Sequence, residues 1–144
     1  MGKVSIVYWS GTGNTEAMAA AMAEGAKDAG AEVELLTVDK AEAAAISEAK
    51  AFALGCPAMG AEELEEGEME PFMAELDSQI AGKTIALFGS YGWGGGEWMR
   101  DWESRVVSDG AAVLSGEGII ADNAPDDDVL AECRAAGAKL AALV

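Results

Sequence analysis

The residues best suited to chemistry form a loop near the start of the chain, Ser10-Gly11-Thr12-Gly13-Asn14-Thr15. Its hydroxyl and amide groups can donate hydrogen bonds, and its glycines let the backbone approach a ligand closely. A helix that begins after such a loop points its first N–H groups at an anion. Because the loop lacks Lys and Arg, it suits a static terminal phosphate rather than phosphoryl transfer. The alternative is a plain Gly/Ser/Thr turn with a helix cap.

Two known phosphate-binding patterns do not match this loop. It does not end in the G-K-[ST] of a Walker loop, and Glu16 stands where G-x-G-x-x-G requires its third glycine. The loop therefore predicts an anion site of another kind.

A second loop is aromatic and reads Ser90-Tyr91-Gly92-Trp93-Gly94-Gly95-Gly96. Glycines around Tyr91 and Trp93 predict rings that project from the loop, where a flat heteroaromatic ligand could stack. The alternative is that both rings fold back onto the core. Trp98 and Trp102 lie four residues apart in a helical pattern, and we expect both in the core.

The third loop runs from Cys56 to Glu63 and combines sulfur, glycine and carboxylates. The thioether of Met59 suits an aromatic face, and Gly60 allows the backbone to reorient. Glu62 and Glu63 offer carboxylates to ring N–H donors. The alternative for the acidic run is a solvated face, which we expect for most of its members: Glu62, Glu63, Glu65, Glu66, Glu68 and Glu70. Cys56 is expected to be a small buried apolar residue rather than a nucleophile, because the chain has no histidine to activate it.

Alternating strands and helices position these loops within one domain, residues 1–144. Apolar and β-branched runs predict strands at 3–9, 32–38, 51–56, 83–89 and, interrupted by glycines, 111–121. Helical spacing predicts helices at 14–29, 40–48, 68–79, 97–108 and 126–144. This order predicts an α/β fold with a parallel sheet and helices on both faces. Ligands bind beyond the carboxyl ends of such strands, so the site is expected in the loops at residues 10–15, 56–67, 89–97 and 121–128.

Composition excludes several classes of function. The chain has 9 Lys and Arg against 26 Asp and Glu, a net charge of −17, which disfavours binding to nucleic acid and to anionic membranes. Partner proteins should therefore present basic patches, and we expect a monomer. No membrane span or secretory signal is expected, and the two cysteines, Cys56 and Cys133, fit a reducing cytoplasm. The absence of histidine excludes Ser-His-Asp and Cys-His catalysis and His-ligated metal sites.

The sequence resembles the flavodoxins, most closely the short-chain flavodoxins of anaerobic bacteria. The matching strings are VYWSGTGNTEAMA (Val7 to Ala19), GCPAMGAEELEE (Gly55 to Glu66), EPF (Glu70 to Phe72), LFGSYGWGGGEWM (Leu87 to Met99) and DNAPD (Asp122 to Asp126). The resemblance implies a three-layer sandwich whose five-stranded parallel sheet has the order 2-1-3-4-5. It also implies one non-covalent FMN and a low-potential one-electron carrier that works between reductases and oxidases.

The resemblance implies a role for each loop. The phosphate loop comprises Ser10, Gly11, Thr12, Gly13, Asn14 and Thr15. The isoalloxazine ring lies between Trp93 on one face and Met59 on the other, and its N3–H donates to Glu62. The remaining cofactor-binding residues are Pro57, Ala58, Ser90, Tyr91, Gly92, Gly94, Asp122 and Asn123, the last two beside the ribityl chain or the ring edge.

Gly60 and Ala61 correspond to the peptide that changes orientation on flavin reduction and turns its carbonyl toward flavin N5–H. Ala61 stands where relatives often have Ser, Asp, Asn or Gly. Alanine resists positive φ, so the reoriented peptide is expected to be less stable than with glycine by up to about 1 kcal/mol.

Two other functions are compatible with the same topology. An FMN-dependent quinone or nitro reductase needs a substrate pocket over the flavin, where Trp93 and Met59 leave little room. A receiver-type domain needs an acceptor Asp at the end of the middle strand, where this chain has Cys56-Pro57.

Overall fold

A parallel sheet forms the centre of the computed structural model, which describes residues 2–144. Its strands are β1 (Lys3–Tyr8), β2 (Glu32–Thr37), β3 (Ala51–Gly55), β4 (Thr84–Tyr91), β5 (Ala112–Val113) and β6 (Ile119–Asp122). The order β2-β1-β3-β4-β5 confirms the predicted sheet, and every pair is parallel. Because β1, β3 and β4 lie in the middle, the carboxyl ends of these buried strands meet at one edge.

The last strand position is shared by two short strands, as the glycines in the predicted strand 111–121 indicated. β5 pairs with the start of β4 at Thr84 and Ile85, and β6 pairs with its end from Phe88 to Tyr91. A 3₁₀ turn separates them, with Ser115 (φ 64°) and Gly116 (φ 86°) in the left-handed region. This turn lets β6 continue along the same side of β4 and reach the edge where the loops gather.

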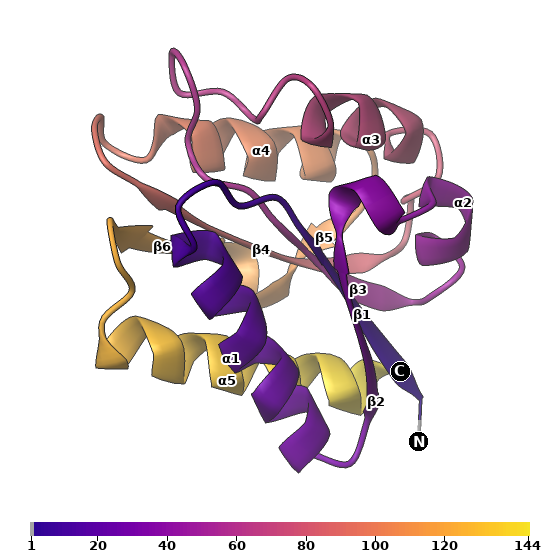
Figure 1. Ribbon diagram of the computed structural model, residues 1–144. Coiled ribbons are helices and arrows are strands. Elements are labelled where there is room, and N and C mark those ends of the chain that lie inside the picture. The colour runs from indigo at the N-terminus through magenta and orange to yellow at the C-terminus, as the bar shows by residue number, and fades with distance from the viewer. Residues whose placement is uncertain (1) are drawn as a thin grey trace.

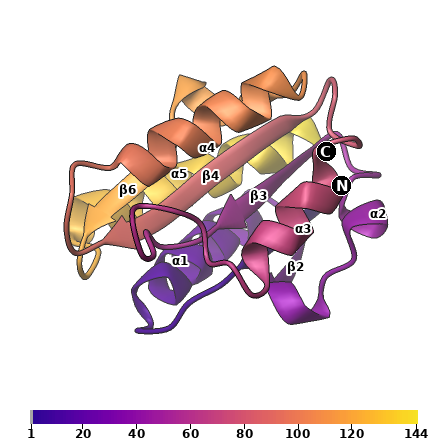
Figure 2. The same cartoon turned by 90° about the horizontal axis from the view of Figure 1, so that it is seen from above.

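Helices cover both faces of the sheet, as Figures 1 and 2 show. Helices α1 (Asn14–Asp28) and α5 (Asp127–Leu143) pack on one face; α2 (Ala43–Ile46), α3 (Met69–Leu76) and α4 (Glu97–Ser108) lie on the other. Each face has its own apolar core, and one contains Trp98 (1% exposed) and Trp102 (2%), which confirms the prediction for these two residues. Within residues 2–144, no helix is both long and apolar enough to cross a membrane.

Helix α2 is shorter than the predicted helix 40–48. It ends at Ile46 because the hydroxyl of Ser47 donates to Ala44 O (3.1 Å) or to Gln79 Oε1 (3.1 Å), and the chain then turns into β3. Serine bonded to nearby backbone carbonyls competes with helix propagation.

Helices α1 and α5 approach so closely that their contact requires glycine. A Cβ on Gly137 would overlap the carbonyl oxygen of Met22, and a Cβ on Gly25 would overlap that of Arg134. The obstacles are backbone atoms, which cannot swing aside as a side chain can. The approach holds both helices against the sheet and fixes the start of α1 at the loop edge.

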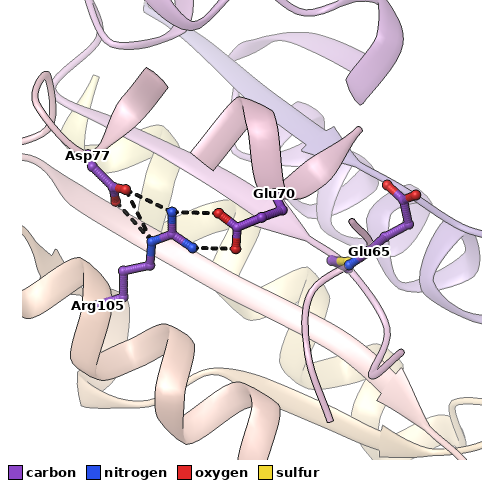
Figure 3. Close-up of polar contacts among 5 residues, drawn as sticks. Glu65, Glu70, Asp77 and Arg105 are labelled. Carbon is purple, nitrogen blue, oxygen red and sulfur yellow. Dashed lines mark hydrogen bonds and ion pairs between the residues drawn. The ribbon is translucent and has the colours of Figure 1, made fainter. Parts of the chain in front are cut away.

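Helices α3 and α4 are joined by a network centred on Arg105 (Figure 3). Its guanidinium donates to both carboxylate oxygens of Glu70 (2.7 and 2.8 Å) and to Asp77 (2.7 to 3.2 Å). These hydrogen bonds raise the pKa of Arg105. Burial opposes ionisation of Asp77, but the bonds from Arg105 outweigh it and lower the pKa of Asp77.

Asp109, at the end of α4, gives the fold a pH-dependent contribution. Its Oδ2 is inaccessible to solvent and has no hydrogen-bond partner among the described residues. Burial, together with the neighbouring Asp77, raises the pKa of Asp109 to about 6. The fold therefore favours the protonated form. This contribution to stability is fully present below the ordinary pKa of 3.8 and is lost as the pH rises through about 6.

We expect the Asp109→Asn variant to melt about 2–4 °C above the parent at pH 8, on the order of 1 kcal/mol after allowance for solvent screening. The neutral amide removes the repulsion from Asp77 that ionised Asp109 experiences. Thermal unfolding at pH 4 and pH 8 measures this difference, which should vanish at pH 4. Asp39→Asn, which removes the same charge from an exposed position, is the control. A gain at pH 8 that persists at pH 4 would contradict the assignment.

Candidate functional site

The predicted loops meet around a cavity of about 270 Å³ at the carboxyl edge of the sheet. Its lining residues are Trp9, Gly11, Thr12, Asn14, Pro57, Ala58, Met59, Ser90, Tyr91, Gly92, Trp93 and Asn123. The other predicted site residues are not part of this lining but belong to the same four loops: Ser10, Gly13, Thr15, Gly60, Ala61, Glu62, Gly94 and Asp122. Four segments far apart in the sequence therefore contribute to one hollow.

The first loop is held in shape by its own hydroxyls. Ser10 Oγ accepts hydrogen bonds from the backbone N–H of Gly13 (3.2 Å) and Glu16 (3.3 Å). Gly13 precedes α1 at φ 94°, and a Cβ there would meet nothing within 4 Å. The loop is thus preformed and open above the first turn of a helix, with neutral donors around it. Such a set of donors fits a phosphate group.

Thr15 connects the first loop to the aromatic loop instead of facing the cavity. It is buried, its Oγ1 lies 3.4 Å from Ser90 Oγ, and it accepts a hydrogen bond from the Ser90 N–H (3.4 Å). These contacts hold the end of the first loop against the end of β4, where the second loop begins.

The two aromatic rings of the second loop behave differently. Trp93 lines the cavity and is 52% exposed, as predicted for a ring that projects from the loop. Tyr91 is the last residue of β4, is half-buried, and packs against Trp98 with ring centroids 5.6 Å apart and a tilt of 48°. Because β4 extends two residues beyond its predicted end, the Tyr91 ring packs against Trp98 and at the same time lines the cavity.

The third loop forms a tight turn beside the cavity. The backbones of Met59 and Glu63 exchange two hydrogen bonds of 2.8 Å and close a turn over Gly60-Ala61-Glu62. The left-handed positions are Gly60 (φ 50°) and Glu62 (φ 57°), not Ala61. A Cβ on Gly60 would meet nothing within 4 Å, so the turn has free space on that side.

Glu62 links the third loop to α4. Its Oε1 accepts a hydrogen bond from the Glu97 N–H (3.0 Å) at the start of that helix, where a negative charge is favourable. Gly94 (φ 76°) passes so close that a Cβ would contact the Glu62 carboxylate. The contact with Glu97 brings the second and third loops together on one side of the cavity.

The fourth loop completes the wall near Tyr91. Asn123 (φ 61°) lines the cavity, and its N–H donates to the Tyr91 carbonyl (2.7 Å). Its Nδ2 donates to Asp122 Oδ1 (2.8 Å). A short polar side chain tolerates the left-handed conformation that this turn requires.

Sequence reasoning did not identify Trp9 as a site residue. It lies directly after β1, lines the cavity, and its Nε1 donates to Glu68 Oε1 (3.2 Å). The signal that could have identified it is its position directly before the loop Ser10–Thr15. The predicted strand 3–9 includes Trp9, whereas β1 ends at Tyr8.

Neither cysteine has the character of a nucleophile. Both thiols are free and buried, and burial raises the pKa of Cys56 and of Cys133 to about 12. The prediction that Cys56 is a small buried residue is confirmed.

Comparison with known proteins gives this cavity a family context. A family model described as Flavodoxin matches residues 6–137. The chain belongs to the flavodoxin family. It is 47% identical over 135 residues to the flavodoxin of Megasphaera elsdenii, covering 92% of this chain and 98% of the relative. It is also 47% identical over 124 residues to the flavodoxin of Clostridium beijerinckii, covering 86% and 89%.

The fold comparison agrees with the sequence comparison. The solution structure of two-electron reduced Megasphaera elsdenii flavodoxin matches with a TM-score of 0.86 and 46% identity, covering 94% of this chain and 98% of that one. The protein is therefore an FMN-binding electron carrier rather than an enzyme, and the reductase alternative is not favoured.

Proposed function

We propose that the protein carries single electrons at low potential between redox enzymes, with FMN bound in the 270 Å³ cavity. The observation that carries this proposal is the combination of an open, neutral loop at the start of α1 with an exposed indole, Trp93, on the same cavity. The loop suits a phosphate, and the indole and the Met59 thioether suit the two faces of a flat ring. Bound FMN supplies the redox chemistry, and the protein forms no covalent bond.

The residues have distinct tasks in this proposal. The phosphate is held by the loop Ser10, Gly11, Thr12, Gly13 and Asn14, and Thr15 contributes only its backbone N–H because its buried hydroxyl faces Ser90. The ring is held between Trp93 and Met59, with Pro57, Ala58 and Gly94 in the adjoining backbone. Glu62 accepts from the ring N3–H with the oxygen that Glu97 does not use. Ser90, Tyr91, Gly92, Asp122 and Asn123 border the ribityl chain and the pyrimidine side.

The turn at Gly60-Ala61 is the mobile element of the proposed site. A backbone carbonyl from this turn would accept a hydrogen bond from flavin N5–H, since an unpaired buried donor there would cost about 1–3 kcal/mol. Free space around Gly60 and its left-handed φ support a change of orientation there.

Carboxylates near the cavity support a low potential. Glu62, Glu63 and Glu65 lie on one loop of a chain with net charge −17. One carboxylate about 10 Å away, at an effective dielectric of about 40, costs an added negative charge roughly 0.8 kcal/mol. That corresponds to about 35 mV for one electron, and several such groups lower the potential by roughly 100 mV.

The net charge of −17 also supports the proposed partners. These are reductases and oxidases that dock through basic patches. We propose a monomer, because copies of a chain with a net charge of −17 repel one another. The large exposed apolar residues lie on four different segments of the fold: Leu35, Trp93, Val107 and Leu143. Two free, buried cysteines support the cytoplasm as its compartment.

The identity of the flavin tests this proposal. We expect the purified protein to be yellow and to release about one FMN per chain on acid treatment, as identified by mass spectrometry. FAD should bind poorly, because a loop that closes on a terminal phosphate leaves no path for an adenylate. NAD(P)H alone should not bleach the colour. Release of FAD, or bleaching by NAD(P)H, would overturn the proposal.

A further inference from the structure

Glu65 has an unusual environment for a residue in an acidic run that is expected to be mostly solvated. Its Oε1 accepts from the N–H groups of Glu68 (2.7 Å) and Met69 (3.0 Å), and its Oε2 accepts from Gly67 (2.8 Å). Burial opposes its ionisation, but these three backbone donors outweigh it and lower the pKa of Glu65. One carboxylate therefore organises the backbone that leads into α3.

The backbone of Glu65 is hydrogen-bonded to Cys56, which precedes the turn closed by Met59 and Glu63 (the Met59 turn). Its N–H donates to Cys56 Sγ (3.4 Å), directly after β3, and its carbonyl accepts from the Glu70 N–H (2.8 Å). Met59 and Glu63 pair inside the segment that this contact closes. A change at Glu65 therefore acts on the loop that carries Met59 to the cavity.

Glu65 also acts on a second lining residue of the cavity, Trp9, through Glu68. The N–H of Glu68 is held by the Glu65 carboxylate, and the Glu68 side chain accepts from Trp9 Nε1 (3.2 Å). Trp9 lines the cavity, and a Cβ on Gly11 would lie 3.1 Å from its ring. The orientation of Trp9 therefore depends on a residue bound to Glu65.

We propose that Glu65 is a positioning residue for the cofactor site, holding both the Met59 turn and Trp9 in the arrangement that binds FMN. This inference rests on the proposed function, since it assumes that FMN occupies the cavity. Glu65 itself does not line that cavity. Its effect is transmitted by the hydrogen bonds to Cys56, Glu68 and Met69.

The test compares FMN binding to the apoproteins of the parent, Glu65→Gln and Glu66→Gln. Both variants remove one negative charge from adjacent positions, so their long-range effect on an anionic ligand is matched. Only Glu65→Gln replaces one of the two oxygens that accept from the backbone with an amide donor, which breaks the three-way set of hydrogen bonds. We expect the Kd of Glu65→Gln to rise about tenfold, as for the loss of charge-assisted hydrogen bonds, and that of Glu66→Gln to stay within about twofold. Equal Kd values for the two variants would overturn the inference.

A spectroscopic measurement separates positioning from general stability. The fluorescence of Trp9 is obtained by subtracting the spectrum of Trp9→Phe in each background. In folded Glu65→Gln apoprotein we expect Trp9 to be more accessible to acrylamide than in the parent. Unchanged accessibility would rule out the link through Glu68.

Glu68→Ala keeps the test decisive if Glu65→Gln does not fold. It removes the acceptor for Trp9 and leaves the Glu65 carboxylate bound to its backbone donors. We expect its Kd for FMN to rise about threefold relative to Glu66→Gln, as for the loss of one modest hydrogen bond. An unchanged Kd would overturn the proposed role of the contact between Glu68 and Trp9. If the parent apoprotein binds no FMN, the proposed function fails instead, before any variant is compared.

Discussion

Trp93→Ala is expected to bind FMN about 5- to 150-fold more weakly than the parent, a loss of roughly 1–3 kcal/mol. Trp93 is 52% exposed in the protein, so its ring contributes little to the folded core. A stacked flavin would cover that exposed area, and removal of the indole takes away both the stacking and the burial. Titration of the apoprotein with FMN, followed by the quenching of flavin fluorescence, measures the change in Kd.

Trp102→Ala is the matched control, because it removes the same side chain from a position that is 2% exposed on α4. Loss of a buried tryptophan should lower the free energy of unfolding by about 3–5 kcal/mol. The Kd for FMN should change much less than in Trp93→Ala. If the two variants showed the same loss of affinity and of stability, the assignment of Trp93 to the binding site would be wrong.

Gly137→Ala is expected to lower the free energy of unfolding by about 2–4 kcal/mol, although alanine is the better helix former by about 1 kcal/mol. The added Cβ would overlap the Met22 carbonyl oxygen and lie 2.8 Å from the Ala26 nitrogen. This overlap can be relieved only if α1 and α5 move apart, and that movement opens the core on this face of the sheet. Urea denaturation measures the change.

Ala135→Val provides the control on the same helix. It adds bulk at an exposed position of α5 and should cost only a few tenths of a kcal/mol. Stabilisation by Gly137→Ala would show that helix propensity outweighs the helix contact, contrary to the packing argument.

The sequence by itself determined the elements and their order, because these depend on local patterns. Buried apolar runs predicted the strands, and the spacing of Trp98 and Trp102 predicted their place in the core. Alternation of strands and helices then required a parallel sheet, and a parallel sheet gathers its loops at one edge. The loop Ser10–Thr15 could be recognised for the same reason, since its glycines and hydroxyls act within six residues.

Only the tertiary structure decided which of these loop residues line the cavity and which hold its walls. Glu62 contacts Glu97, 35 residues away, Thr15 contacts Ser90, 75 residues away, and Trp9 contacts Glu68, 59 residues away. Such contacts depend on the spacing of strands in the sheet, which leaves no periodic signal in the chain.

The tertiary structure also decided the role of residues whose type suggested another one. Glu65 belongs to a run that composition describes as solvated, yet three backbone donors converge on it. Tyr91 and Trp93 lie two residues apart, and only the length of β4 and the position of Trp98 place the Tyr91 ring against Trp98 at the cavity wall and leave Trp93 exposed. Side-chain direction at a strand end is set by what packs beside it, and that neighbour comes from another element of the fold.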